Sequence, residues 1–125
     1  MATIGVIPGD GVGPEVIGEA LAILEDLGAT HGLGLTFQPF DLGSDRYLRS
    51  GEVLPDSVLQ ELSSCDAILL GAIGDPRVPP GVLEKGLLLR IRFEFQQYIN
   101  LRPIQLMSGV ETPIKGKGPG EIDLV

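Results

Sequence analysis

Short apolar runs and longer amphipathic stretches alternate along the first hundred residues. Residues 2–7, 33–37 and 66–72 are apolar with few interruptions, which is typical of strands in a sheet covered on both faces. Between the first two runs, apolar positions recur every three or four residues, which predicts a helix that begins near Pro14 and stops at Gly28. The predicted apolar face of this helix consists of Val16, Ile17, Ala20, Leu21, Leu24 and Leu27.

Six of the ten prolines lie in the second half of the chain. A short helix is predicted over residues 56–63, with Asp56 as its cap. Residues 74–81 contain three prolines and two glycines and therefore form a loop, after which a long helix is predicted over residues 82–97. Extended chain over residues 99–107, a loop over residues 108–120 and a strand from Glu121 complete the prediction.

The order of these elements predicts an α/β fold, because strands that alternate with helices form a parallel sheet with helices on its faces. The change to proline-rich extended chain near Asn100 indicates a boundary between two units. We therefore expect residues 1–99 to belong to a first α/β domain and residues 100–125 to start a second, incomplete one. The chain stops within a predicted strand, so we expect a fragment of a longer polypeptide.

The amino-acid composition limits the classes of binding partner and the cellular compartment that we expect. With 5% aromatic residues and no Trp, the core must be largely aliphatic. A net charge of −8 argues against nucleic acid and anionic membranes as partners, because both are bound by clustered cations. Cys65 is the only cysteine, which excludes an internal disulfide. No secretory leader or membrane-spanning run is visible, and we expect a cytoplasmic protein.

The predicted helix over residues 82–97 carries the clearest candidate binding chemistry. At α-helical spacing it places Lys85, Leu88, Leu89 and Arg92 on one face, and Arg102 follows in an extended segment. A stripe of cations and leucines favours a ligand that is partly carboxylate and partly aliphatic. The alternative is that Arg90 and Arg92 only extend along the edge of a core helix with their guanidinium groups in water.

A glycine-rich loop, GDGVG, joins the first strand to the first helix. It does not match the dinucleotide-binding fingerprint, because Pro14 stands where the third glycine belongs and no acidic residue ends the second strand. Two interpretations remain: backbone N–H groups that meet a ligand, or a tight turn that needs positive φ. Asp10 either caps the helix or faces the ligand. The 71–76 loop follows another strand and is expected to face the same cleft if the two strands are neighbours.

Three segments, IPGDGVGPEV, LLGAIGDP and GLLLRIRFEFQQYINLRP, closely resemble the N-terminal part of the isocitrate/isopropylmalate dehydrogenase family. The resemblance runs from Ile4 to Val125. It implies a three-layer parallel-sheet α/β domain, cut off at the start of the second domain. It also implies NAD-linked oxidation of a 2-hydroxy acid followed by decarboxylation, assisted by Mg²⁺ or Mn²⁺, in a homodimer.

The resemblance also implies roles for individual residues. Arg92 and Arg102 match the arginines that bind substrate carboxylates, while Leu88 and Leu89 match side chains that receive an isopropyl group. Isocitrate dehydrogenases have a hydroxyl-bearing residue in place of Leu88, so the implied substrate is 3-isopropylmalate, converted to 4-methyl-2-oxopentanoate in leucine biosynthesis. A malate- or tartrate-type decarboxylating dehydrogenase and a non-catalytic anion-binding fragment are the alternatives.

On the cofactor side, the resemblance implies contacts from Val12, Gly74, Asp75, Glu84 and Lys85. Many members of the family have glutamate at the position of Lys85, and some have glycine at that of Asp75, so this chain departs from the pattern here. The family's proton-transfer and metal-binding residues would lie beyond residue 125. We therefore expect no catalytic residue and no metal ligand within residues 1–125, and no activity from this segment alone.

Overall fold

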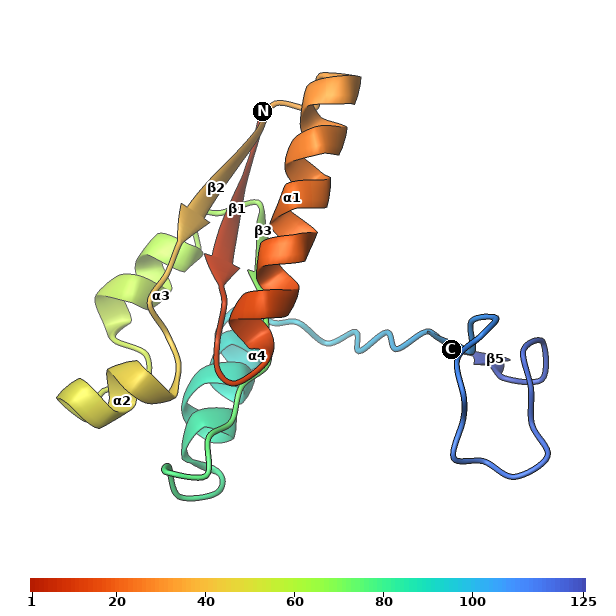
Figure 1. Ribbon diagram of the computed structural model, residues 1–125. Helices are drawn as coiled ribbons and strands as arrows, with labels where there is room; N and C mark the ends of the chain where they lie inside the picture. Colours follow the sequence, from red (N-terminus) through yellow and green to blue (C-terminus); the bar gives the residue numbers. More distant parts are fainter.

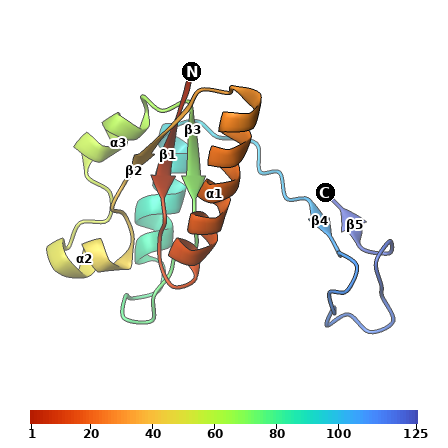
Figure 2. The same ribbon diagram turned by 45° about the horizontal axis from the view of Figure 1, so that its top comes forward.

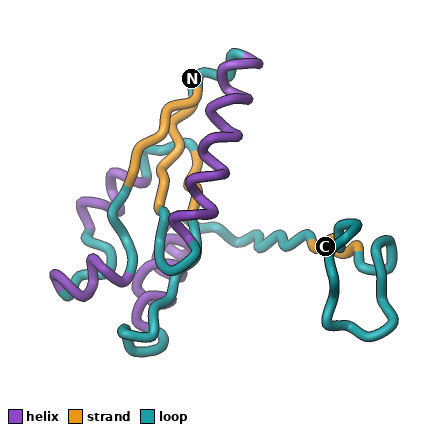
Figure 3. The backbone as a smooth tube through the Cα atoms, in the orientation of Figure 1, coloured by secondary structure: helices purple, strands orange, loops and turns teal.

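The computed structural model describes residues 1–125 and contains an α/β unit followed by an extended tail (Figure 1). The α/β unit comprises β1 (Ala2–Ile7), α1 (Gly13–His31), β2 (Leu35–Pro39), α2 (Ser44–Ser50), α3 (Asp56–Leu62), β3 (Ala67–Leu70), η1 (Glu84–Leu89) and α4 (Arg90–Glu94). The tail contains β4 (Ile104–Gln105) and β5 (Asp123–Leu124), which pair in antiparallel orientation. Apart from these two short strands, the chain after α4 is loop (Figure 3).

The sheet has three parallel strands, with β1 between β2 and β3. Its register is marked by Ile4, which pairs with Phe37 on one side and with Ala67 on the other. The helix α1 covers one face of the sheet, and α2, α3 and α4 lie on the other side (Figure 2). The predicted three-layer α/β architecture is confirmed, and it brings the carboxyl ends of three parallel strands to one edge.

The hydrophobic core lies between the sheet and the layer formed by α3, η1 and α4. Its members are Ile7, Phe40, Leu42, Leu54, Leu62, Leu87 and Ile91. All but one are aliphatic, as the scarcity of aromatic residues requires. The core therefore connects β1, whose end carries the glycine loop, to the helix that carries the candidate arginine.

That helix differs from the prediction in its winding. Residues 84–89 form a π-helix, η1, and the helix ends at Glu94 instead of residue 97. Leu83, Leu87 and Ile91 are buried at a strict spacing of four. This spacing gives one apolar stripe that faces the core through η1 and into α4. Gly86 lets η1 pack closely, because a Cβ there would lie 3.0 Å from Val53.

The first helix also differs from the prediction. It continues through Gly28 to His31 and ends at Gly32, which adopts the left-handed conformation and donates its N–H to the carbonyl of Gly28. Gly28 stays helical because its open side packs against Leu35. Two predicted face residues, Val16 and Leu27, are exposed, since the buried stripe of α1 is narrower than its apolar pattern.

Smaller corrections concern the ends of elements. The cap assigned to Asp56 is wrong: Asp56 is the first residue of α3, follows Pro55 and makes no capping hydrogen bond. The second strand lies two residues later than predicted, and the third is shortened to residues 67–70. In the tail, pairing is limited to β4 and β5, because proline and glycine interrupt the rest. None of the helices is both long and apolar enough to cross a membrane.

Candidate functional site

The loops that follow the three strands meet at one edge of the sheet. The N–H of Asp10 donates to the carbonyl of Ala72 at 2.7 Å, and the N–H of Gly71 donates to the carbonyl of Ile7 at 2.9 Å. These bonds connect the end of β1 directly to the end of β3. The expectation that the glycine loop and the 71–76 loop face one place is therefore confirmed, and it follows from β1 and β3 being neighbours.

The glycine loop is shaped by contact with the protein itself. Gly9 has a φ of 77°, and a Cβ on it would lie 2.1 Å from the carbonyl oxygen of Ala72. Only glycine allows both this conformation and this approach. Of the two interpretations of GDGVG, the tight turn needing positive φ is the one that the structure displays.

Asp10 neither caps α1 nor points into solvent. Its side chain is buried, with the residue 6% exposed, and its carboxylate accepts three hydrogen bonds. Ser44 donates its N–H and its hydroxyl to Oδ1, each at 2.7 Å, and Gly74 donates its N–H to Oδ2 at 2.9 Å. Asp10 thus joins the loops after β1, β2 and β3. Sequence reasoning missed Ser44, because no local pattern connects it to a residue 34 positions earlier.

Asp75 belongs to a second polar cluster in the same loops. Its carboxylate accepts hydrogen bonds from the side chain of Arg77 at 2.7–3.1 Å and from the hydroxyl of Ser44 at 3.3 Å. Arg77 also pairs with Asp45 at 2.8 Å. The hydrogen bonds from Arg77 hold the pKa of Asp75 well below its usual range. Asp75 is therefore ionised at neutral pH, and its charge is balanced within the chain.

Three of the five residues expected on the cofactor side line one hollow of about 200 Å³: Gly74, Asp75 and Glu84. Oε2 of Glu84 accepts the N–H of Gly81 at 2.9 Å, and its other carboxylate oxygen has no hydrogen bond. Val12 and Lys85 are exposed and do not line this hollow. The structure thus brings Gly74, Asp75 and Glu84 together and leaves Val12 and Lys85 apart from them.

Arg92 differs from the other arginines of the α/β unit. It is half-buried, and its guanidinium makes no hydrogen bond or ion pair within residues 1–125. It lines an open hollow of about 340 Å³ together with Phe93, Gln96, Gln97 and Tyr98. Gln96 has a φ of 52°, the only positive value outside glycine, and this turn ends the helix beside the hollow. A partly buried cation without an internal partner is suited to an anionic ligand.

Arg90 has two internal partners. Its guanidinium donates to the carbonyl of Leu54 at 2.5 Å and pairs with Asp56. These contacts connect α4 to α3 and to the segment before it. Arg90 therefore has a structural role, in keeping with the alternative interpretation of the helix for this arginine.

The prediction that Lys85, Leu88, Leu89 and Arg92 share one face of the helix is wrong for Lys85. Because η1 has more residues per turn than an α-helix, Lys85 and Arg92, seven apart, no longer lie above one another. Leu88 remains about one turn before Arg92 and is half-buried, whereas Leu89 is 42% exposed. Neither leucine lines the hollow beside Arg92.

Arg102 lies in the exposed tail, outside the α/β unit. Its Nε donates to Oδ1 of Asn100 at 3.1 Å, and it does not line the hollow beside Arg92. The two arginines therefore do not form one pocket within this segment. No three of the His, Cys, Asp and Glu side chains in residues 1–125 gather closely enough to hold a metal ion.

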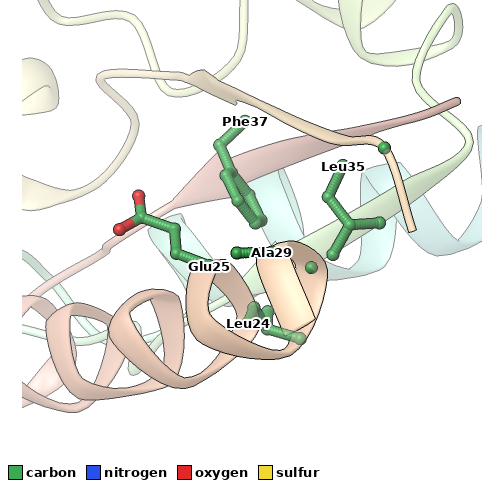
Figure 4. Close-up of a pocket in the computed structure, with 7 residues that line it drawn as sticks. Leu24, Glu25, Ala29, Leu35 and Phe37 are labelled. Carbon is green, nitrogen blue, oxygen red and sulfur yellow. The ribbon is translucent and has the colours of Figure 1, made fainter. Parts of the chain in front are cut away.

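Another hollow, of about 340 Å³, lies between α1 and the edge strand β2 (Figure 4). Leu35 and Phe37 project from β2 toward α1, and Leu24 and Ala29 face them from the helix. No residue expected in the site lines this hollow. It is a gap between a helix and a sheet edge, apart from the loops at the strand ends.

Comparison with known proteins gives consistent matches. The family model described as isocitrate/isopropylmalate dehydrogenase matches residues 3–125. The chain is 55% identical over 122 residues to 3-isopropylmalate dehydrogenase of Thermobifida fusca (strain YX) and 58% identical over 122 residues to that of Mycolicibacterium gilvum (strain PYR-GCK). Each match covers 98% of this chain and 34% of the relative, so the chain spans about a third of the length of these relatives.

Solved structures show the same fold. A β-decarboxylating dehydrogenase from Thermococcus kodakarensis, in its apo form, is similar with a TM-score of 0.68 and 34% identity, over 84% of this chain and 30% of that one. A protein from Thermus thermophilus has a TM-score of 0.73 and 31% identity, over 98% of this chain and 23% of that one.

Proposed function

Because the chain belongs to the isocitrate/isopropylmalate dehydrogenase family, we propose that it is the substrate-recognition segment of an NAD-dependent enzyme that oxidises and decarboxylates 3-isopropylmalate. The product is 4-methyl-2-oxopentanoate, and the process is leucine biosynthesis. The activity belongs to the full-length protein that contains this chain, a homodimeric cytoplasmic enzyme, and this segment alone is inactive.

The observation that carries the proposal is the state of Arg92. It is half-buried and free of internal partners, while Arg90, two residues before it, has two internal partners. A guanidinium group presents parallel N–H donors that fit the two oxygens of a carboxylate. Arg92 is therefore available for the substrate carboxylate, and Arg102 provides a second cation from residues 100–125, the start of the second domain.

The leucines provide the complementary half of the recognition. Leu88 and Leu89 contact the isopropyl group, and their hydrocarbon side chains disfavour the additional carboxylate of isocitrate, because an unpaired charge is costly beside apolar groups. Arg92 and Leu88 lie about one helical turn apart, so one ligand reaches both. The segment in this way orients the hydroxyl-bearing carbon for loss of its hydride.

The loop hollow is the proposed nicotinamide end of the cofactor site. Gly74, Asp75 and Glu84 line it, Val12 and Lys85 contribute from outside it, and NAD when bound accepts the hydride. The nicotinamide ring of NAD is positively charged, and one carboxylate oxygen of Glu84 makes no hydrogen bond within the chain. This negatively charged group would attract the ring to the hollow. Residues 1–125 contain no cluster of three His, Cys, Asp or Glu side chains that could hold the Mg²⁺ or Mn²⁺ of the reaction. We therefore place the ligands of this metal ion outside residues 1–125.

An assay of the full-length protein tests this function. NADH formation is measured with 3-isopropylmalate, isocitrate, malate and tartrate in the presence of Mg²⁺ or Mn²⁺. We expect the highest kcat/KM with 3-isopropylmalate. A higher kcat/KM with malate or tartrate would assign the protein to the related hydroxy-acid dehydrogenases, and no NADH with any of them would reject an enzymatic role.

Leu88 determines the preference for the branched substrate. We expect Leu88→Ala in the full-length protein to lower kcat/KM for 3-isopropylmalate by about 10- to 100-fold, the value of a lost apolar contact in a specificity pocket. The kcat/KM for malate, which has no branch, changes less. Leu48→Ala is the matched control, because Leu48 is an exposed leucine on α2. An equal loss with both substrates would show that Leu88 acts through stability alone.

A further inference from the structure

The side chain of Asp10 is buried, and its carboxylate accepts hydrogen bonds from the loop after β2 and from the loop after β3. These hydrogen bonds come from Ser44 and from the N–H of Gly74, and the backbone N–H of Asp10 donates to the carbonyl of Ala72. Gly43 makes room for it, since a Cβ there would lie 2.6 Å from Oδ1 of Asp10. The carboxylate is thus enclosed by its partners.

The loop that contains Gly74 has no regular secondary structure of its own. Residues 71–81 contain three prolines, which lack N–H donors, and form no helix or strand. Within the loop, the N–H of Val78 donates to the carbonyl of Asp75 at 3.0 Å, and the side chain of Arg77 donates to the carboxylate of Asp75. Arg77 also pairs with Asp45 of α2, but this ion pair is exposed and therefore weak. Gly74, adjacent to Asp75 at the rim of the hollow, is anchored to Asp10 instead.

Ser44 connects Asp10 to the hollow that Gly74 and Asp75 line. Its buried hydroxyl donates its single proton to Oδ1 of Asp10 at 2.7 Å and lies 3.3 Å from Oδ2 of Asp75, so it bridges the two carboxylates with the shorter bond to Asp10. Hydrogen bonds to an ionised acceptor in a buried setting are stronger than neutral ones. Asp10, Ser44 and Asp75 therefore form a continuous connection from the glycine loop to the wall of the hollow.

We propose that Asp10 is a positioning residue for the cofactor: through Gly74 and Ser44 it holds the 71–81 loop in the shape that receives the nicotinamide end of NAD. This inference rests on the proposed function, because it assigns the hollow to NAD. Asp10 touches no reacting atom; it acts by ordering the loop before the cofactor arrives. The affinity for NAD then depends on Asp10 more strongly than the affinity for 3-isopropylmalate, whose proposed contacts lie on η1, on α4 and at Arg102 in the tail.

Two variants of the full-length protein test the proposal. Asp10→Asn keeps the size but replaces one acceptor by an N–H donor, which leaves either Ser44 or Gly74 without a partner. Ser44→Ala is milder, because it removes the hydroxyl and keeps the backbone bond to Asp10. Ser50→Ala is the matched control: it removes a hydroxyl from the same helix, α2, that donates to the carbonyl of Arg46 and accepts the N–H of Glu52, both outside the 71–81 loop.

The first readout is hydrogen exchange in the peptide covering residues 71–81, which needs no activity. We expect exchange about tenfold faster in Asp10→Asn, a smaller increase in Ser44→Ala and no change in Ser50→Ala. Unchanged exchange in both Asp10→Asn and Ser44→Ala would overturn the anchor. Should Asp10→Asn fail to fold, Ser44→Ala alone decides the result.

The second readout is the Michaelis constant for each substrate. We expect KM for NAD to rise about tenfold in Asp10→Asn and about threefold in Ser44→Ala, while KM for 3-isopropylmalate stays within about twofold. Equal changes in both KM values, or a faster-exchanging loop with an unchanged KM for NAD, would overturn the positioning role. A wild-type protein that oxidises no 2-hydroxy acid would reject the proposed function, and the exchange measurement would still decide whether Asp10 anchors the loop.

Discussion

Arg92→Ala in the full-length protein is expected to lower kcat/KM for 3-isopropylmalate by about 30-fold to several thousand-fold. This range corresponds to about 2–5 kcal/mol, the cost of truncating one partner of a buried, hydrogen-bonded charge pair. Within the chain the guanidinium has no partner to lose, so the free energy of unfolding changes little. Steady-state kinetics and thermal unfolding of the same variant measure the two quantities.

Arg92→Lys separates charge from geometry. Lysine keeps the positive charge but lacks the planar fork that binds both oxygens of a carboxylate, so we expect an intermediate kcat/KM. KM rises in both variants, and kcat falls as well if the contact also orients the carbon that loses hydride. A lysine variant equal to wild type would show that Arg92 contributes only charge.

Arg90→Ala is the matched control for Arg92→Ala, because it also removes an arginine side chain from α4, two positions earlier. Its contacts with Leu54 and Asp56 are internal, so we expect a loss of about 1 kcal/mol in unfolding free energy, given that Asp56 is exposed. The KM for 3-isopropylmalate stays near that of wild type. The opposite result, a stability loss for Arg92→Ala with unchanged kinetics, would reject Arg92 as a substrate residue.

Gly9→Ala is expected to destabilise the full-length protein by about 3–4 kcal/mol or more, because it combines backbone strain with a steric clash. The left-handed conformation at a φ of 77° costs an alanine about 1–2 kcal/mol. The added Cβ would also lie 2.1 Å from the carbonyl oxygen of Ala72, so the two loops must separate. That carbonyl accepts the N–H of Asp10, and the separation breaks this hydrogen bond as well. Chemical denaturation measures the change.

Gly11→Ala isolates the contribution of the close approach. Gly11 also has a positive φ, 55°, but no atom lies within 4 Å of a Cβ placed on it. We therefore expect only the conformational cost, about 1–2 kcal/mol. Equal destabilisation by Gly9→Ala and Gly11→Ala would show that the contact between the loops contributes nothing to stability.

Local patterns predicted the fold more successfully than they predicted the site. Strand and helix periods along residues 2–72 gave β1, α1, β2, α3 and β3 in the correct order, because each of these elements buries an apolar run or stripe. They missed α2, whose residues 44–50 were expected to be turns. The ends of elements were less accurate: Gly28 resembles a helix stop, but its position against Leu35 keeps it helical. Asp56 resembles a cap, but it begins α3 and pairs with Arg90 instead.

The site depended on distances that the sequence does not contain. Arg90 and Arg92 belong to the same short helix, and only the structure shows that one is paired while the other has no partner. Lys85 was placed with Arg92 by α-helical spacing, which the π-helical winding of η1 invalidates. Ser44 carried no recognisable signal, since its importance comes from Asp10 and Asp75, 34 and 31 residues away.

By itself the sequence determined the order of the elements apart from α2, the aliphatic core and, through its three motifs, the family to which the chain belongs. These properties are encoded in neighbouring residues, where period and composition are visible directly. Only the tertiary structure decided the winding of η1, the partners of Arg90 and the enclosure of Asp10 by three loops. Parallel strands bring residues that are distant in sequence to one edge of the sheet, and their contacts arise only when the sheet has formed.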